Sequence, residues 1–282
     1  MSNQDPATFF KNISAKLAQS TPANQNVSPL LTQVDQGNGA SQQTSSSRNN
    51  AAAAAGGNSR TVHASALIER VRYIRNQPKN TSPIDASAHP SLLPAPAPHH
   101  RNKKCLILDV DETLVHSSYQ ETGKHDLHLS IDLDENTTVN VFVAYRPFLQ
   151  EFLEAISPIF EVVVFTASLG KYCNPLMDAI DKKRLLGNLR LFREHCSLVS
   201  STFVKDLSLL GRNLDQVAII DNSPVAYLFQ QRNAIPITSW FDNPDDDELR
   251  RLIPVLKALA EAPNVYEVLD NYNALLQLQQ QE

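Results

Sequence analysis

The sequence predicts an α/β fold: a parallel, Rossmann-like sheet with helices on both faces and a small β insertion after the first strand. Three largely apolar runs, 105–108, 160–165 and 217–220, are typical of buried parallel strands, which are apolar on both faces. Helical patterns lie between and after these runs, and this alternation favours a parallel sheet. After the first run, the segments 127–131 and 139–143 alternate apolar and polar residues, as half-buried antiparallel strands do.

The other elements of the predicted domain follow in order. A turn at 134–136 joins the two alternating segments, and Pro147 begins a helix at its favoured first position. One side of this helix carries an apolar stripe formed by Phe148, Phe152 and Ile156. Beyond it we expect a second helix near 171–181, a further strand at 233–237, and a helix over 245–259 that Pro254 bends or splits.

The first 100 residues differ in composition from the rest of the chain. They contain 9 of the 17 prolines, an alanine tract at 51–55 and a Ser/Gln/Asn-rich run at 41–50. Such a segment buries too little apolar surface to offset the entropy lost on ordering. We therefore expect residues 1–100 to be a disordered, low-complexity tail and linker.

The predicted folded domain covers residues 101–270, and residues 271–282 are expected to be the end of a helix or a tail. Two segments of the N-terminal tail, 9–17 and 67–74, have apolar residues at helical spacing. Isolated helices this short are marginal, so we expect nascent helices without a fixed partner. The alternative is that one of them docks a partner protein or a membrane surface.

Charge divides the chain at the same place. Residues 1–100 contain 8 Lys/Arg and 4 Asp/Glu, and residues 101–282 contain 17 and 26, so the net charges are +4 and −9. An acidic domain argues against direct binding to nucleic acid through backbone phosphates. We see no signal peptide, transmembrane segment or lipidation motif. The three cysteines are too scattered for a disulfide framework or a zinc site, so we expect a nuclear or cytoplasmic location, with Cys105 packed in its strand.

Two carboxylates, Asp109 and Asp111, follow the first strand, and Thr113 comes next. Residues i and i+2 of a strand point to one face, and ligands of open α/β sheets bind at the carboxyl ends of the strands. One carboxylate could then attack as a nucleophile while the other moves a proton. A simple turn would use the same residue types. A calcium loop is excluded, because its sixth and twelfth positions, which require Gly and Glu, hold Leu114 and Gln120.

Four motifs occur in a fixed order: DVDETLVHSS at 109–118, VVVFTAS at 162–168, FVKDLS at 203–208 and IIDNSP at 219–224. In this order they resemble the aspartate-based phosphatases of the haloacid dehalogenase superfamily. The resemblance is to the small phosphatases related to those acting on the carboxy-terminal domain of RNA polymerase II. It covers roughly residues 102–270, and four ordered motifs are much more specific than any one alone.

The resemblance implies a role for each residue at a strand end. Asp109 would be the nucleophile that forms an aspartyl-phosphate, and Asp111 would protonate the leaving oxygen and then activate water. Thr166 would donate a hydrogen bond to a phosphoryl oxygen, and Lys205 would neutralise charge on the phosphoryl group. The resemblance also implies Mg²⁺ held by Asp109, Asp111 and Asn222, with Asp221 as a weaker candidate ligand, and further phosphate contacts from Thr113, Ser168 and Arg193. Each residue alone has an ordinary structural explanation, such as a solvated ion pair for Lys205 beside Asp206.

The implied activity is Mg²⁺-dependent hydrolysis of phosphoserine and phosphothreonine in proteins, with the carboxy-terminal domain of RNA polymerase II as one candidate substrate. A small insertion leaves the site open, which suits a phosphorylated protein segment. The alternatives are a small-metabolite phosphatase and a non-catalytic scaffold that binds phosphoproteins. A partner could also bind through the N-terminal tail.

Two segments depart from the family pattern. Residues 145–148 replace a Lys-Arg-Pro-Gly-like helix start, and residues 199–203 lack a glycine that often precedes the Val-Lys-Asp of the third motif. Both departures bear on the choice of substrate more than on the chemistry. We expect His116 to hold the loop after the nucleophile, and His195 and Trp240 to pack or to line a substrate groove.

Overall fold

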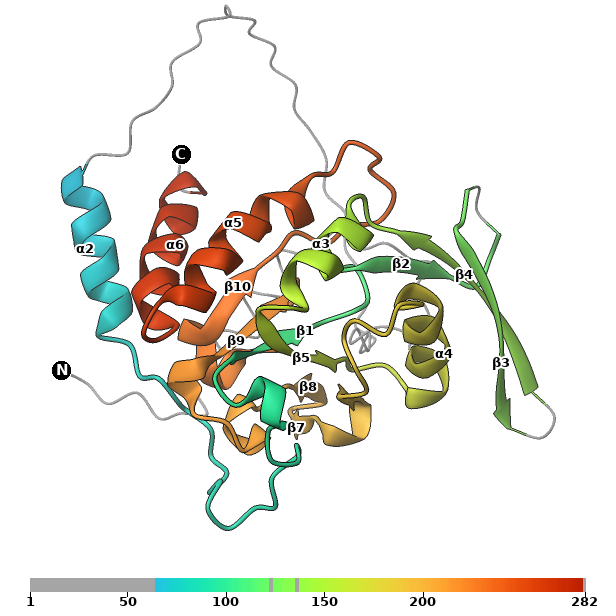
Figure 1. Ribbon diagram of the computed structural model, residues 1–282, viewed down its shortest axis with the longest axis horizontal. Coiled ribbons are helices and arrows are strands. Elements are labelled where there is room, and N and C mark those ends of the chain that lie inside the picture. The colour runs from blue at the N-terminus through green and yellow to red at the C-terminus, as the bar shows by residue number, and fades with distance from the viewer. Residues whose placement is uncertain (1–63, 122–123, 135–136, 281–282) are drawn as a thin grey trace, which may run out of the picture.

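A five-stranded parallel sheet forms the centre of the protein, in the order β10-β9-β1-β5-β6. The computed structural model describes residues 64–121, 124–134 and 137–280 (Figure 1). The strands are β1 (Lys104–Leu108), β5 (Phe160–Phe165), β6 (Arg190–Leu191), β9 (Val217–Asp221) and β10 (Ala234–Pro236). Every residue of β1, β5 and β9 is buried, which explains why their sequences are largely apolar. The predicted α/β fold with a parallel sheet is confirmed.

The two faces of the sheet are covered differently. Alternate side chains of β1 point to opposite faces, so Leu106 and Leu108 join one core cluster while Cys105 and Ile107 join another. The first cluster is closed by the long helices α3 (Leu149–Ile156), α4 (Gly170–Ile180), α5 (Glu248–Glu261) and α6 (Tyr266–Gln279). The second is closed by the 3-10 helix η3 (Leu207–Leu210), neighbouring loops and Leu93. Cys105 packs inside its strand as expected.

The parallel register gathers the candidate site residues at one edge. The last residue of β1 pairs with the residues just before the ends of β5 and β9. Asp109 directly follows β1, Thr166 directly follows β5, and Asp221 ends β9 with Asn222 next. These four residues therefore lie together at the carboxyl edge of the three central strands, where open α/β sheets bind ligands.

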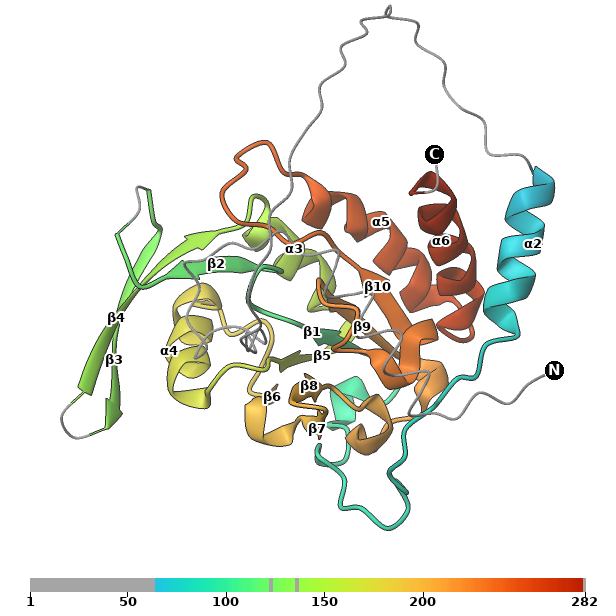
Figure 2. The ribbon, with the colours of Figure 1, turned by 180° about the vertical axis from the view of Figure 1, so that it is seen from behind.

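The β insertion is a small antiparallel sheet in the order β2-β4-β3. Its strands are β2 (Val115–Ser118), β3 (Leu127–Asp134) and β4 (Thr137–Tyr145). The β3–β4 ribbon projects from the body of the protein (Figures 1 and 2). The predicted insertion is confirmed, and β2 is an addition that the sequence did not indicate.

Two predicted helix features differ in the structure. The first helix begins at Leu149 rather than at Pro147, because Phe148 adopts a left-handed backbone with φ 64° and serves as the N-cap. Helix α5 continues without a break through Pro254, so the predicted split does not occur.

The N-terminal part of the described chain is packed on the domain, which corrects the expectation of a disordered tail through residue 100. Helix α2 (Ala64–Arg75) lies against α6 (Figure 2), and Val71 and Ile74 are buried together with Ala274. The partner for this apolar stripe is thus another part of the same chain. The other predicted helical segment, 9–17, lies outside the described residues.

The remaining described elements are short. They are η1 (Pro98–His100), η2 (Arg193–His195), β7 (Ser197–Val199), β8 (Thr202–Val204), η4 (Leu214–Gln216) and η5 (Leu228–Asn233). Strands β7 and β8 form an antiparallel hairpin just before Lys205. Across residues 64–121, 124–134 and 137–280, no helix has the length and apolar character needed to cross a bilayer.

Candidate active site

The loop after β1 turns back on itself and brings Thr113 to Asp109. The Leu114 amide donates to the Val110 carbonyl over 2.8 Å, and Glu112 takes a left-handed backbone with φ 55°. The turn places the Thr113 hydroxyl 2.9 Å from Asp109 Oδ2, to which it donates a hydrogen bond. Thr113 is fully buried, and Asp109 is nearly so.

Lys205 joins two of the strand-end carboxylates. Its ammonium donates to Asp109 Oδ1 over 2.5 Å and to Asp221 Oδ2 over 2.6 Å, and all three side chains are buried. Burial lowers the pKa of Lys205, but the two carboxylates outweigh this and raise the pKa above its usual value. Lys205 is therefore a fixed positive charge beside Asp109, where it can neutralise an incoming phosphate.

Asp111 lies among three hydroxyl groups. Its Oδ2 accepts from Ser168 Oγ over 2.7 Å and from Thr166 Oγ1 over 3.3 Å, and its Oδ1 accepts from the Tyr172 hydroxyl over 2.7 Å. Burial, and then the charges of Glu112 and Asp109, raise the pKa of Asp111 to about 7. A carboxyl group with this pKa can give up and accept a proton near neutral pH.

Tyr172 is a site residue that the sequence did not reveal. It lies on the second helix of the domain, four residues after Ser168, and no motif marks it. Because its single proton goes to Asp111, Ser117 must donate to the Tyr172 oxygen, which lies 2.6 Å away. Burial is the main reason that its pKa is raised well above the usual value, so Tyr172 remains a donor at neutral pH.

Asn222 and Asp221 complete the cluster. Asn222 Nδ2 donates to Ser239 Oγ over 2.9 Å. This bond orients the amide so that Oδ1 faces the Thr113 hydroxyl, at 3.3 Å. Burial, and then the charge of Asp109, raise the pKa of Asp221 to about 7, against the opposing effect of Lys205. The buried cluster therefore contains three carboxyl groups, those of Asp109, Asp111 and Asp221, and one ammonium, that of Lys205.

Arg193 packs against the residues that carry the cluster's hydroxyl groups, and its amide donates to the Ser168 carbonyl over 3.1 Å. Its Nε donates to the Ala167 carbonyl over 2.6 Å, and its guanidinium stacks 5.2 Å from the centroid of the Phe203 ring. Arg193 thus lies beside the turn that carries Thr166 and Ser168.

The two histidines and the tryptophan make local contacts. His116 lies 3.3 Å from the Glu112 carboxylate, which places it against the loop after Asp109. His195 Nδ1 accepts from the Phe192 amide over 3.0 Å, and the buried Trp240 donates to the Asn243 carbonyl over 2.8 Å. These contacts agree with the packing roles expected for them.

A family model described as NLI interacting factor-like phosphatase matches residues 104–266. The chain is 46% identical over 177 residues to CTD small phosphatase-like protein 1 of Caenorhabditis elegans, covering 63% of this chain and 36% of that protein. It is 49% identical over 173 residues to a probable C-terminal domain small phosphatase of Dictyostelium discoideum, covering 61% of this chain and 56% of that protein. It is 44% identical over 178 residues to human carboxy-terminal domain RNA polymerase II polypeptide A small phosphatase 1, covering 63% of this chain and 67% of that protein.

Among solved structures, the fission yeast RNA polymerase II CTD phosphatase Fcp1 bound to beryllium fluoride aligns with a TM-score of 0.42 at 18% identity, covering 63% of this chain and 56% of that one. The chain matches about a third of the C. elegans relative and just over half of the D. discoideum relative. The family model, in contrast, covers more than half of this chain, including all the strand-end residues described above. The chain therefore belongs to the NLI interacting factor-like phosphatase family.

Proposed function

We propose that this chain is a Mg²⁺-dependent protein serine/threonine phosphatase that works through an aspartyl-phosphate on Asp109. The observation that carries this proposal is the pair of carboxylates after β1 with opposite surroundings. Asp109 is ion-paired to Lys205, while Asp111 accepts three hydroxyl hydrogen bonds and has a pKa raised to about 7. A carboxylate held by an ammonium suits a nucleophile, and a carboxyl group with a raised pKa suits a proton carrier.

In the first step, an Asp109 oxygen forms a bond to phosphorus while the bond from phosphorus to the serine or threonine oxygen breaks. That oxygen takes the proton of Asp111, whose pKa of about 7 leaves a substantial share of this carboxyl group protonated at neutral pH. In the second step, Asp111 accepts a proton from water, the water oxygen attacks phosphorus, and the bond to Asp109 breaks to release inorganic phosphate. Lys205 holds a positive charge beside the phosphoryl group throughout.

The donor set of the site fits Mg²⁺. Asp109 Oδ2 and Asn222 Oδ1 both face the Thr113 hydroxyl, at 2.9 and 3.3 Å, and hard oxygen donors of this kind suit that ion. Among the described residues, no group of three His, Cys, Asp or Glu side chains is arranged to hold a metal. The proposed ligand set therefore needs the Asn222 amide and the Asp111 backbone carbonyl beside Asp109, with Asp221 nearby. When bound, the ion would neutralise charge between the nucleophile and the phosphoryl group.

We infer that the substrate is phosphoserine or phosphothreonine in an extended protein segment. The β insertion is small, and its apolar residues Leu127, Leu129 and Val139 are only half-buried, so they can contact a neighbouring proline or aliphatic residue. A proline would lose little backbone entropy on binding. The relatives named for the carboxy-terminal domain of RNA polymerase II make that domain one candidate substrate. A nuclear or cytoplasmic location remains a prediction from the sequence.

Kinetics on matched peptides would test this proposal. Peptides carrying phosphoserine, phosphothreonine or phosphotyrosine, each followed by proline or alanine, would be compared with small phosphate esters, with and without Mg²⁺. We expect the phosphoserine and phosphothreonine peptides to have the highest specificity constants, with roughly a tenfold gain if the proline contact contributes about 1.4 kcal/mol. Equal specificity constants across the peptides would overturn the inference that the β insertion contacts the peptide. Higher specificity constants for the esters would favour a small-metabolite phosphatase. No turnover of any substrate would favour a non-catalytic scaffold.

A further inference from the structure

The chain between α2 and η1, residues 76–97, runs along the protein as a strap without regular secondary structure. The Thr81 amide donates to the Phe229 carbonyl over 2.9 Å, and the Leu92 amide donates to the Leu209 carbonyl over 2.9 Å. Leu93 is buried in the second core cluster. The strap is thus attached to the domain near Thr81 and again at Leu92 and Leu93.

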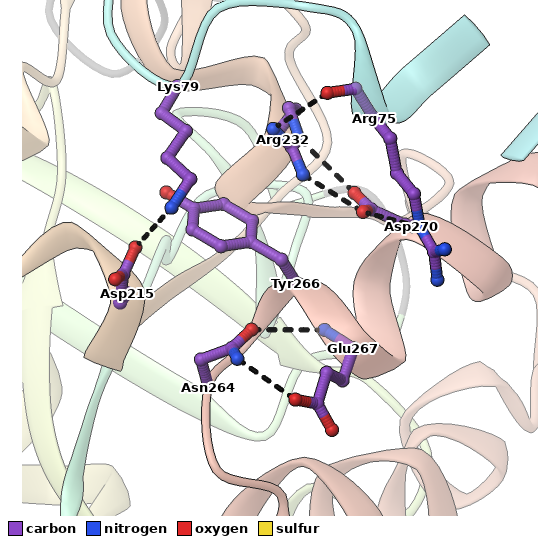
Figure 3. A pocket seen from close by; sticks show the side chains of 8 residues that line it. All are labelled: Arg75, Lys79, Asp215, Arg232, Asn264, Tyr266, Glu267 and Asp270. Carbon is purple, nitrogen blue, oxygen red and sulfur yellow. Dashed lines mark hydrogen bonds and ion pairs between the residues drawn. The ribbon is translucent and has the colours of Figure 1, made fainter. Parts of the chain in front are cut away.

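The N-terminal end of the strap is fixed by a group of charged side chains at a depression of about 530 Å³ (Figure 3). Lys79 forms an ion pair with Asp215 at 2.8 Å, and its ammonium lies 4.5 Å from the centroid of the Tyr266 ring. Arg232 pairs with Asp270 at 2.9 Å and also donates to the Gln77 carbonyl over 3.3 Å. Because its basic side chains are paired with acidic ones, we interpret this group as an anchor for the strap.

Directly after Thr81, Ser82 contacts the residue that follows Lys205. The Ser82 hydroxyl donates a hydrogen bond to Asp206 Oδ2. The other oxygen, Asp206 Oδ1, accepts from the Ser208 amide over 3.0 Å and from Gln230 Nε2 over 2.8 Å, and the Gln230 amide also bonds Asn80 of the strap. Asp206 is only 1% exposed. The strap therefore helps to hold a buried carboxylate one residue away from the lysine that contacts Asp109.

Ser82 is followed by Pro83, and the strap presents this dipeptide in an accessible, non-helical segment. Thr81 and Pro83 are exposed and Ser82 is half-buried. The other Ser-Pro pairs of the described residues begin at Ser157, at the end of α3, and at Ser223, directly after Asn222. Protein kinases act on extended segments, so Ser82–Pro83 is the pair whose surroundings best fit a kinase that recognises serine before proline.

We propose that Ser82 is a regulatory phosphorylation site of this phosphatase. A proline-directed kinase transfers the terminal phosphoryl group of ATP to Ser82 Oγ: the new oxygen–phosphorus bond forms, the bond to ADP breaks, and the serine proton passes to the base of the kinase. The product carries nearly two negative charges at the position of a hydroxyl that now contacts the Asp206 carboxylate. Repulsion between these anions detaches the strap around Ser82, and the segment that carries Lys205 loses one of its supports.

The expected consequence is a loss of activity, because small displacements of a catalytic group are costly. A displacement of about 1 Å can reduce a rate by roughly a hundredfold. For Lys205, held at 2.5 and 2.6 Å from two carboxylates, we expect at least a tenfold loss of turnover on an aryl phosphate, which needs no peptide groove. The inference rests on the phosphatase chemistry proposed above but not on any particular protein substrate.

The site is tested first by mapping. The folded, full-length Asp109→Asn chain, which cannot remove a phosphate from itself, would be incubated with ATP and a cyclin-dependent or mitogen-activated protein kinase. Mass spectrometry should then locate phosphate on Ser82, and Ser82→Ala should remove that signal. If Ser82 stays unmodified in the folded chain while a peptide of residues 76–88 is phosphorylated, the strap does not admit the kinase and the proposal is wrong.

The effect is tested next with matched variants of the active chain. Ser82→Glu should lose at least tenfold in turnover and increase hydrogen exchange of residues 202–210. Ser82→Ala and Ser87→Glu, which adds the same charge at an exposed serine of the strap, should keep most of the activity. If Ser82→Glu fails to fold, the phosphorylated wild-type chain replaces it, and removal of the phosphate by alkaline phosphatase should restore activity. Unchanged activity and exchange, or an equal loss in Ser82→Ala, would overturn the proposal.

Discussion

The hydrogen bond from Tyr172 to Asp111 provides a quantitative test of the proton carrier. Replacing Tyr172 with Phe removes a hydroxyl that lies 2.7 Å from Asp111 Oδ1 and leaves the rest of the ring in place. This bond lowers the pKa of Asp111, opposing burial and the neighbouring carboxylates that raise it to about 7. A hydrogen bond to a charged group contributes about 1.5–3 kcal/mol, and one pKa unit corresponds to about 1.4 kcal/mol. Tyr172→Phe should therefore raise the pKa of Asp111 by roughly one unit or more.

The sign of the effect on activity follows from the first chemical step. Asp111 must be protonated to deliver its proton to the leaving oxygen, so kcat/KM should fall as pH rises through its pKa. In Tyr172→Phe, this alkaline limb should move to higher pH by roughly one unit. The measurement is kcat/KM on an aryl phosphate against pH, with the same substrate for every variant so that its own ionisation cancels.

A matched control is available in Tyr266. Its hydroxyl also makes a buried hydrogen bond, to Asn233 Oδ1 at 3.1 Å, but it lies away from the strand-end cluster. Tyr266→Phe should leave the alkaline limb where it is in the wild-type chain. If the limb does not move in folded Tyr172→Phe, or moves to lower pH, then Asp111 is not the titrating acid or Tyr172 does not stabilise its ionised form.

Three further predictions concern the nucleophile, a buried ion pair and the N-terminal segment. Asp109→Asn should leave the fold intact and abolish turnover of an aryl phosphate, because an amide is a poor nucleophile and a weaker Mg²⁺ ligand. Arg146→Met should lower the free energy of unfolding, measured in urea, by about 3 kcal/mol, because two carboxylates, Asp246 and Glu248, lose a buried partner at 2.8 Å. Deleting residues 1–95 should lower the free energy of unfolding by roughly 3 kcal/mol or more, because it uncovers the apolar surface buried by α2 and the strap.

Controls and opposing outcomes differ among these three. Substantial turnover by folded Asp109→Asn would rule out an aspartyl-phosphate on that residue. The control for Arg146 is Arg250→Met, which removes an exposed ion pair with Glu151 and should lower the free energy of unfolding much less. Equal effects of the two substitutions would show that burial of the Arg146 pair is unimportant. A truncated chain as stable as the full chain would show that α2 and the strap add nothing to the fold.

The central sheet and the residues at its edge were predictable because local patterns determine them. A strand that is apolar on both faces has few alternatives to the middle of a parallel sheet, and β1, β5 and β9 agree with their predicted ranges to within a residue. Side chains that follow such strands must meet at the carboxyl edge, as Asp109 and Thr166 do.

Features that depend on contacts between distant residues were not predictable. The apolar stripe of α2 has the same pattern whether or not a partner exists, and its partner on α6 lies about 200 residues further along the chain. Tyr172 reaches Asp111 only because α4 packs beside the strand ends, and its spacing in the sequence gives no sign of this.

The backbone conformation of the two segments that depart from the family pattern, 145–148 and 199–203, could not be predicted from the sequence either. Phe148 stands where the family pattern has glycine, and Ser200 and Ser201 lie in the second departing segment, 199–203; all three adopt a positive φ. These residues adopt a left-handed backbone that glycine would favour, at some cost in strain. Sequence comparison shows the missing glycine but not whether the turn is preserved.

The most direct test of the proposed mechanism is to capture the phosphoryl group on the enzyme. A phosphoserine peptide would be mixed with an excess of the wild-type chain and Mg²⁺, quenched in acid within the first turnover, and digested for mass spectrometry. The predicted result is a transient phosphoryl group on Asp109 that hydroxylamine removes and that disappears as inorganic phosphate forms. Phosphate on another residue, or free phosphate formed with no phosphorylated enzyme at any time of quenching, would contradict it.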